Sequence, residues 1–286
     1  GAPDRQWSTF DDLKKMAEYV NTMLRSYGIS VEDRVAIVLP NGPEMASAFL
    51  TLVQSCTTAP LNPNYREEEY LFYLKELNAK AILVLEDYNG PALTAANNLN
   101  ISVIRMSVRQ QHLAGEFELL GEVHNSVTSE QLPSQNDIAL ILHTSGTTSR
   151  PKIVPLLHSN IVSSAENIRE SLSLSEQDIC MNIMPLFHIH GLIAAVTASI
   201  GAGGSVWCTP GFDALKFFRW LDDVSPSWFT AVPTMHQAIL GRSERNKNII
   251  DGNKLRFLRS SSASLPSQVM KELERVFSAP IIEGYG

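Results

Sequence analysis

A turn rich in hydroxyl groups follows an apolar run and has the residue types best suited to chemistry. Residues 138–142 are all apolar, and the sequence His-Thr-Ser-Gly-Thr-Thr-Ser-Arg-Pro-Lys follows them and ends at Lys152. Gly146 can adopt a positive φ that points main-chain N–H groups at an anion, and the hydroxyls add donors. Lys152 adds a charge for a polyphosphate. The composition predicts a phosphate-binding loop, although a surface turn linking two strands has the same composition.

Two common phosphate-binding motifs are excluded for this turn. A Walker A loop has Ser or Thr directly after its lysine, whereas this chain has Ile153. A dinucleotide-binding fingerprint needs G-x-G-x-x-G after a strand, and that pattern does not occur in the sequence. The turn therefore belongs to another class.

Histidines and small residues form a second group of candidates. His188 and His190 lie in the segment Met-Pro-Leu-Phe-His-Ile-His-Gly, and His236 ends the segment Ala-Val-Pro-Thr-Met-His. The histidine pair is also compatible with hydrogen bonds to local backbone groups, and no third ligand for a metal lies nearby in the sequence. Ser262–Ser264 precede Pro266, a pattern that also fits the start of a helix.

Short apolar runs and helical periodicity indicate the elements that position these residues. The first helix is expected to begin with a capping box of Ser8 and Asp11 and to end at Gly28. Further helices are predicted near 44–54, 66–77, 159–172, 192–200, 214–224 and 267–277. Strands are predicted at 35–39, 81–85, 101–105, 138–142, 179–184, 205–208, 228–232, 255–259 and 281–282. Their continuous apolar character and the repeated β-α order predict an α/β fold, with mostly parallel sheets and helices on both faces.

Chain length and composition bound the domain organisation. The 286 residues exceed the roughly 100–200 of a single domain, so we expect two α/β sub-domains, residues 1–136 and 137–286. Residues 107–136 are polar and are expected to be irregular or to form a surface hairpin. No apolar run reaches the roughly 18 residues of a membrane span, and the N-terminus lacks the form of a signal peptide. A soluble protein without integral membrane contact is expected.

Charge and cysteine content narrow the function classes. The formal charge of −7 argues against nucleic acid as a partner, because a phosphate backbone requires clustered Lys and Arg. The three cysteines are widely spaced and show no ligand spacing, so neither a disulfide framework nor a zinc site is expected. Reduced thiols predict a cytoplasmic protein.

Four segments in order resemble the adenylate-forming superfamily, which includes acyl-CoA synthetases, peptide-synthetase adenylation domains and firefly luciferase. Thr144–Lys152 resembles its signature loop, and the segments 184–191, 230–236 with 255–266, and 282–286 resemble its later motifs. Ser149 and Ile153 stand where glycine is usual in the family. The Ser-Arg-Pro-Lys loop also occurs in oxalyl-CoA synthetases, and the segments taken together resemble that subgroup most.

The resemblance implies a fold and a set of site residues. The fold is the large N-terminal domain of adenylate-forming enzymes, truncated before the small C-terminal lid domain, which is absent here. Residues 137–286 then hold the phosphate loop and the acyl pocket, and their C-terminal end is incomplete. ATP is assigned to Thr144, Ser145, Gly146, Thr147, Thr148, Lys152, Ser262, Ala263, Ser264, Glu283, Gly284, Tyr285 and Gly286. The acid is assigned to His188, His190, His236 and Ser262, with Lys152 and His188 expected to be catalytic.

The implied reaction joins a carboxylic acid to coenzyme A by way of an acyl-adenylate, with ATP as substrate and Mg²⁺ as cofactor. Oxalate is the expected acid, with the histidines as neutral or cationic donors to its second carboxylate. The Mg²⁺ ligand is expected beyond Gly286, so no metal ligand is predicted within this chain. An amino-acid-activating domain and a non-catalytic nucleotide-binding module are the alternatives. The isolated chain is expected to be inactive without its C-terminal domain, and the sequence is compatible with a homodimer and with a peroxisomal location.

Overall fold

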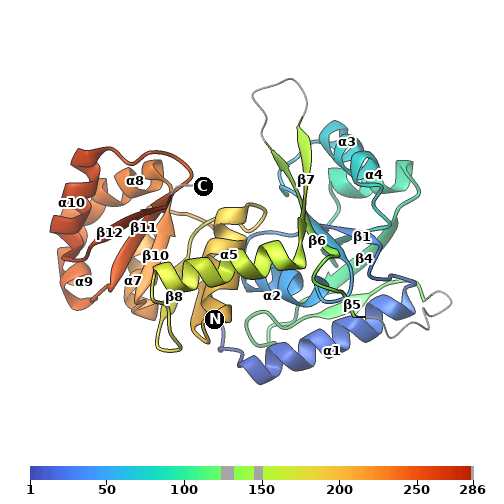
Figure 1. The fold of residues 1–286 in the computed structure, drawn as a ribbon, viewed down its shortest axis with the longest axis horizontal. Helices are drawn as coiled ribbons and strands as arrows, with labels where there is room; N and C mark the ends of the chain where they lie inside the picture. Colours follow the sequence, from blue (N-terminus) through green and yellow to red (C-terminus); the bar gives the residue numbers. More distant parts are fainter. Residues whose placement is uncertain (124–131, 145–150, 285–286) are drawn as a thin grey trace. The chain divides into compact units, whose positions relative to one another are not determined.

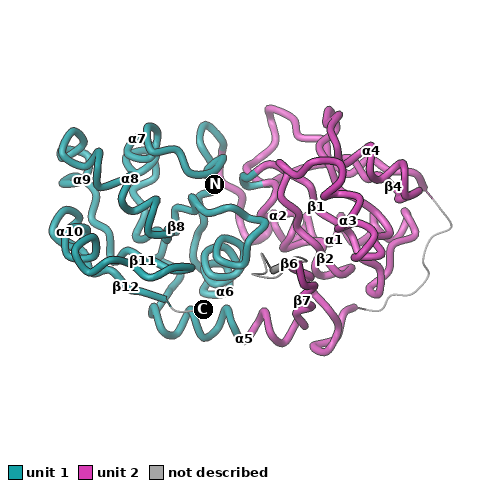
Figure 2. Tube along the Cα trace, turned by 90° about the horizontal axis from the view of Figure 1, so that it is seen from above, with its two compact units in different colours: residues 1–5, 41–43, 164–286 teal, residues 6–40, 44–163 magenta. Residues whose placement is uncertain are grey.

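The structure is a computed structural model that describes residues 1–123, 132–144 and 151–284. In these ranges the strands form two sheets, with strand orders β5-β4-β3-β1-β2-β6-β7 and β12-β11-β10-β8-β9 (Figure 1). The chain forms two compact units, which are coloured separately in Figure 2. Unit 1 comprises residues 1–5, 41–43 and 164–286, and unit 2 comprises residues 6–40 and 44–163.

Unit 2 contains the first sheet, which is parallel from β4 to β6 and antiparallel at both edges. Its strands are β1 (Arg34–Val38), β2 (Thr57–Pro60), β3 (Ala81–Leu85), β4 (Ser102–Ser107), β5 (Glu118–Leu120), β6 (Ile138–Thr144) and β7 (Lys152–Leu157). Its helices are α1 (Phe10–Ser26), α2 (Pro43–Leu52), α3 (Glu67–Leu77) and α4 (Pro91–Asn98). Apolar side chains of α3 and α4 pack with those of β1 and β3 in one core cluster.

The first helix begins one residue later than predicted. Thr9 is the N-cap of α1 and forms the capping box with Asp12, so the predicted box of Ser8 and Asp11 is wrong. The Ser8 hydroxyl instead donates to the carbonyl of Ala114. Gly28 has a φ of +74°, as expected for a glycine that ends a helix.

Unit 1 contains the second sheet, in which all strand pairs are parallel. Its strands are β8 (Ile179–Asn182), β9 (Ser205–Cys208), β10 (Trp228–Ala231), β11 (Phe257–Ser261) and β12 (Ile281–Gly284). Its helical elements are η1 (His190–Thr197), α6 (Ala198–Gly201), α7 (Phe217–Val224), α8 (Pro233–Ser243), η2 (Glu244–Asn246), α9 (Lys247–Gly252) and α10 (Ser267–Phe277), and α5 (His158–Ser171) runs from unit 2 into unit 1. The predicted α-helix at 192–200 is in fact a π-helix, η1, followed by the short α6.

Helices cover both faces of the second sheet. Phe229 and Ala231 face the core cluster formed with α7, α8, α9 and α10. Thr230 lies between them in the strand and points to the opposite face, where it contacts His190 of η1. The structure thus confirms the α/β class with mostly parallel sheets.

The compact units do not follow the predicted boundary between residues 136 and 137. Strands β6 and β7 follow that boundary in sequence, but β6 pairs with β2 in the first sheet. At the N-terminus, the amino group of Gly1 donates to the carbonyl of Val206 at 2.8 Å, so the first residues join unit 1. Contacts between segments that are distant in the sequence therefore set the boundaries of the two compact units.

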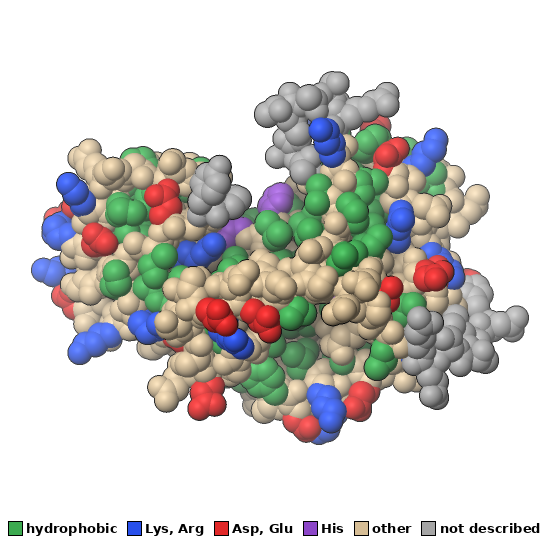
Figure 3. All heavy atoms as spheres, viewed as in Figure 1, with side chains coloured by type: hydrophobic (Ala, Val, Ile, Leu, Met, Phe, Trp, Pro, Cys, Tyr) green, Lys and Arg blue, Asp and Glu red, His purple; other side chains and the backbone are tan. Residues whose placement is uncertain are grey.

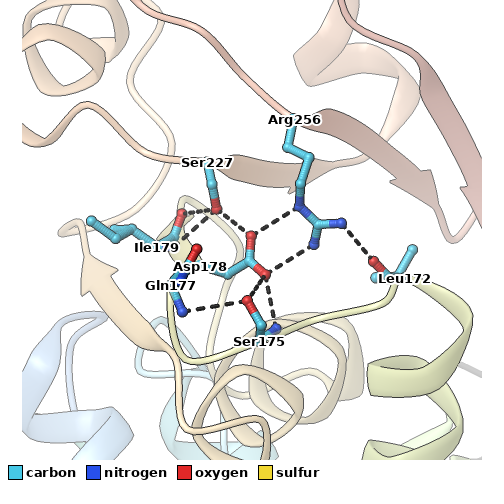
Figure 4. A network of polar contacts seen from close by, with 7 residues as sticks. All are labelled: Leu172, Ser175, Gln177, Asp178, Ile179, Ser227 and Arg256. Atoms are coloured by element: carbon cyan, nitrogen blue, oxygen red, sulfur yellow. Dashed lines mark hydrogen bonds and ion pairs between the residues drawn. The ribbon is translucent and has the colours of Figure 1, made fainter.

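An ion pair between the buried Asp178 and the partly exposed Arg256 fixes the amino ends of three strands in unit 1 (Figure 4). Arg256 Nε and Nη2 each donate to the Asp178 carboxylate at 3.0 Å, and the Ser227 hydroxyl donates to the same carboxylate at 2.7 Å. These residues directly precede β11, β8 and β10. Arg256 Nη1 also donates to the carbonyl of Leu172, just beyond α5. Hydrogen bonds from Ser227 and Arg256 lower the pKa of Asp178 despite its burial.

The surface carries charges of both signs, and the cysteines are buried. Lys and Arg side chains are interspersed with Asp and Glu on the face shown in Figure 3. Cys56, Cys180 and Cys208 are free and buried. Among the described residues, no helix is both long enough and apolar enough to cross a membrane.

Candidate functional site

The predicted site residues of unit 1 lie where the strands of its sheet end. Because β8, β10, β11 and β12 are parallel, their carboxyl ends share one edge, and ligands of open α/β sheets bind at such edges. The π-helix η1 follows β8, and the loop after β11 begins at Ser262. The structure therefore brings the described parts of the segments 184–191, 230–236, 255–266 and 282–284 to the same edge.

Backbone contacts shape the turn between β8 and η1. Asn182 Nδ2 donates to the carbonyl of Met184 at 3.1 Å, and the Met184 amide donates to Asn182 Oδ1 at 3.3 Å. A β-carbon on Gly191 would collide with the carbonyl oxygen of Pro185. This close approach explains why glycine follows the second histidine of the segment.

His188 is the exposed member of the histidine pair. Its ring centroid lies 4.4 Å from that of Phe187. Although the side chain is exposed, neighbouring protein partly desolvates the ring and lowers its pKa from 6.5. The ring is therefore neutral at physiological pH and can exchange hydrogen bonds with a bound acid.

His190 is buried, and both of its ring nitrogens contact hydroxyl groups. Nε2 lies 2.6 Å from Thr230 Oγ1, and Nδ1 lies 3.0 Å from Ser262 Oγ. Since Thr230 Oγ1 also accepts from Arg259, the geometry favours a Thr230 hydroxyl that donates to Nε2 and an Nδ1–H that donates to Ser262. Burial and the charge of Arg259 lower the pKa of His190 to about 4. The ring is a neutral link in a hydrogen-bond chain that ends at Ser262.

His236 is fully buried in α8 and does not reach the surface of the site. Its Nε2 donates to the backbone carbonyl of Arg259 at 3.1 Å, and its Nδ1 has no partner among the described residues. Burial lowers the pKa of this ring to about 4. The structure gives His236 a supporting position behind Arg259, in place of the predicted contact with the acid.

The loop after β11 presents small side chains at the edge of the sheet. Ser262 has a φ of +72° and is exposed together with Ala263 and Ser264. Because its Oγ accepts the Nδ1–H of His190 in this arrangement, the Ser262 hydroxyl proton remains available to a ligand. A backbone turn flanked by small residues is the surface expected for contact with a flat base.

Glu283 and Gly284 hold this loop from the neighbouring strand. Glu283 Oε1 accepts from the amide of Leu265 at 2.7 Å, and the carbonyl of Gly284 accepts from the Ser261 hydroxyl at 2.8 Å. Glu283 thus contacts the backbone of the loop after β11, and its assignment to ATP binding stays a prediction. Tyr285 and Gly286, assigned to ATP as well, lie outside the described residues.

Arg259 is a member of the site that sequence reasoning missed. Its Nη1 donates to Thr230 Oγ1 at 3.3 Å, and a β-carbon on Gly284 would lie 2.6 Å from its Nη2. The guanidinium therefore lies over the backbone of Gly284. A charged residue between buried Leu258 and Ser260, near the end of an apolar strand, was the available signal.

The predicted phosphate loop joins β6 to β7 in unit 2. The two strands pair antiparallel, with Thr144 opposite Lys152 in the register. Lys152 is exposed at the start of β7. Ser145, Gly146, Thr147 and Thr148 lie outside the described residues, as does the side chain of Thr144. In the parts of the chain that the structure describes, no group of three or more His, Cys, Asp or Glu side chains is arranged to hold a metal ion.

Known proteins match the chain over nearly its full length. An Arabidopsis thaliana protein named oxalate–CoA ligase is 40% identical over 266 residues, which cover 90% of this chain and 51% of that protein. A Saccharomyces cerevisiae oxalate–CoA ligase is 33% identical, with 97% of this chain and 56% of that protein covered. ATP-bound MatB from Rhodopseudomonas palustris has a similar fold, with a TM-score of 0.80, 22% identity, and coverage of 99% of this chain and 57% of that one.

The chain spans about half the length of the curated relatives that it matches. The family described as AMP-binding enzyme matches residues 2–286. The similar fold and the site segments at the carboxyl edge agree with that match, and the chain belongs to the AMP-binding enzyme family.

Proposed function

We propose that the complete protein is an ATP-dependent acid–thiol ligase that converts a small acid such as oxalate into an acyl-CoA by way of an acyl-adenylate. The observation that carries the choice of acid is the polar character of the edge of the second sheet. His190, Thr230, Arg259 and Ser262 form one hydrogen-bonded chain there. A long-chain acid would require an apolar tunnel at the same place. The 40% identity to the Arabidopsis oxalate–CoA ligase supports the same choice.

The reaction takes two steps. A carboxylate oxygen of the acid forms a bond to the α-phosphorus of ATP, and the bond to the bridging oxygen breaks and releases pyrophosphate. The thiolate of coenzyme A then forms a bond to the carbonyl carbon of the mixed anhydride, and AMP leaves with the oxygen. Both steps require alignment and charge neutralisation more than covalent participation of the protein.

The ATP-binding roles proposed here fall to two groups of residues. Lys152 and the loop Thr144–Thr148 are assigned to the polyphosphate. Ser262, Ala263, Ser264 and Gly284–Gly286 are assigned to the adenosine end. Glu283 supports this second set because it holds the amide of Leu265.

For the acid, the direct contacts proposed here are the exposed His188 and the Ser262 hydroxyl. His190 orients that hydroxyl through its Nδ1, and His236 holds the backbone of Arg259. Both buried rings are neutral, because burial lowers the pKa of each to about 4. The positive charge in this part of the site therefore comes from Arg259, and these two buried histidines act in the neutral form among the neutral or cationic forms that the sequence suggested.

Magnesium ion supplies charge neutralisation for the polyphosphate in chemistry of this type. The described residues provide no set of ligands for it, so the roles above are assigned to protein groups alone. Coenzyme A is the second substrate.

Pyrophosphate exchange with a panel of acids tests the proposal on the complete protein. We expect exchange that depends on oxalate and exceeds that with amino acids or long-chain acids. Dependence on an amino acid would support an amino-acid-activating enzyme instead, and nucleotide binding without any exchange would support a non-catalytic module. We also expect residues 1–286 alone to form no adenylate, and measurable formation would contradict that part of the proposal.

A further inference from the structure

Arg259 is a half-buried cation for which the described residues provide no acidic partner. Its guanidinium donates to the hydroxyl of Thr230, and no described carboxylate lies within ion-pair distance of it. Arg256, which directly precedes the same strand, differs because its Nε and Nη2 both contact the carboxylate of Asp178. A desolvated cation without a counter-ion is costly, so it indicates a place where an incoming anion binds.

The surroundings of Arg259 direct its guanidinium toward the carboxyl edge of the sheet. Arg259 is the register partner of Thr230 in β10, and its guanidinium extends past this pair to Gly284, at the end of β12. Glycine leaves the space that the guanidinium occupies, since even a β-carbon there would lie 2.6 Å from Nη2. The backbone carbonyl of Arg259 is held by His236 from behind.

The same guanidinium begins the hydrogen-bond chain that ends at an exposed donor. Arg259 contacts Thr230, Thr230 contacts His190, and His190 contacts Ser262. The chain places one cationic donor group and one hydroxyl donor at the same edge of the sheet. A small acid with two carboxylates presents a matching pair of acceptors, whereas an acid with one carboxylate leaves one donor group unmatched.

We propose that Arg259 is a specificity-determining residue that binds the non-reacting carboxylate of a small dicarboxylic acid, while the other carboxylate attacks ATP. The inference rests on the proposed function, because it concerns the acid of that reaction. Arg259 would be the residue that distinguishes dianionic from monoanionic acids. Planar bidentate recognition of a carboxylate is the task for which an arginine is better suited than a neutral histidine.

The test compares oxalate with monomethyl oxalate in pyrophosphate exchange by the complete protein. These acids share the reacting carboxylate, and only oxalate has the second charge. We expect Arg259→Gln to raise KM for oxalate about 10- to 100-fold, the range for a lost hydrogen bond to a charged group. We expect KM for monomethyl oxalate to change less than about 3-fold, and Arg259→Lys to restore part of the oxalate affinity.

Arg275→Gln is the matched control, because it removes an exposed arginine of α10 that pairs with Glu272. It should leave both KM values unchanged. If Arg259→Gln fails to fold, Arg259→Lys replaces it, and a rise in KM for oxalate alone still supports the proposal. Equal effects on both acids, or no effect on either, would overturn it. If the wild-type protein uses monocarboxylates and no dicarboxylate, the proposed acid is wrong as well. Measurements on the wild type alone identify that outcome.

Discussion

The burial of His236 predicts a loss of stability on acidification that one substitution removes. Burial lowers the pKa of this ring from 6.5 to about 4 in the folded protein. The unfolded chain therefore binds a proton more readily between these values, and stability falls as pH falls through that window. A difference of about 2.5 pKa units corresponds to about 3 kcal/mol in full. Between about pH 7 and about pH 5 the loss from this one ring is about 2 kcal/mol.

Urea unfolding of the complete protein at both pH values measures this effect. Three of the four tryptophans of this chain, Trp207, Trp220 and Trp228, lie in unit 1, so its fluorescence reports mainly on the unit that contains His236. His236→Gln keeps a donor for the carbonyl of Arg259 and cannot titrate. We expect its stability to fall by about 2 kcal/mol less than that of the wild type over the same pH step.

The control for this experiment is His112→Gln, which removes one histidine from unit 2. We expect it to keep the pH dependence of the wild-type fluorescence transition. An identical pH dependence for His236→Gln and the wild type would refute the reasoning, because it would show that the His236 ring titrates alike in both states.

Three further predictions follow from single contacts. Asp178→Asn removes the charge that pairs with Arg256 and should lower the free energy of unfolding by about 1.5–3 kcal/mol, the range for hydrogen bonds to a charged group, measured by urea unfolding near neutral pH; an unchanged midpoint would contradict a stabilising pair. Gly191→Ala sets a methyl group against the Pro185 carbonyl, and overpacking should cost about 1–3 kcal/mol and slow pyrophosphate exchange; a variant equal to the wild type in melting temperature and exchange would refute this. Lys152→Ala should reduce exchange by at least about 100-fold without a change in melting temperature, and full exchange activity would remove the support for the phosphate loop.

The elements that the sequence predicted well are those with uniform apolar runs. β1, β3 and β10 lie within a residue or so of their predicted ranges, because buried parallel strands are apolar on both faces. β2 was not predicted because its sequence is Thr-Thr-Ala-Pro. Thr57 and Thr58 can be buried there because their hydroxyls donate to the carbonyls of Ile138 and Ala139. β7 contains Pro155, which an edge strand tolerates but which reads as a strand breaker in the sequence.

The predicted motifs identified which segments meet at the site, but not which side chains face a ligand. His188 and His190 are two residues apart, yet the first is exposed and the second is buried against Thr230. Periodicity could not separate them, because the segment enters a π-helix whose turn is wider than that of an α-helix. His236 faces inward because α8 packs on the apolar face of the sheet. These orientations depend on tertiary contacts that the sequence does not state.

Arg259 of β11 and Arg256, which directly precedes this strand, together make the strongest case for a function at one end of the sheet. Arg256 precedes the strand and donates to the carboxylate of Asp178, which also accepts from the Ser227 hydroxyl and from the backbone amide of Ser175. Arg259 lies three residues further along, is held by neutral groups, and has no described acid. If both served stability alone, the second would be better replaced by an apolar residue, since a buried charge without a partner destabilises a fold. Its presence at the carboxyl edge is explained when an anion completes the pair during the reaction, and this explanation requires that the anion belong to the substrate.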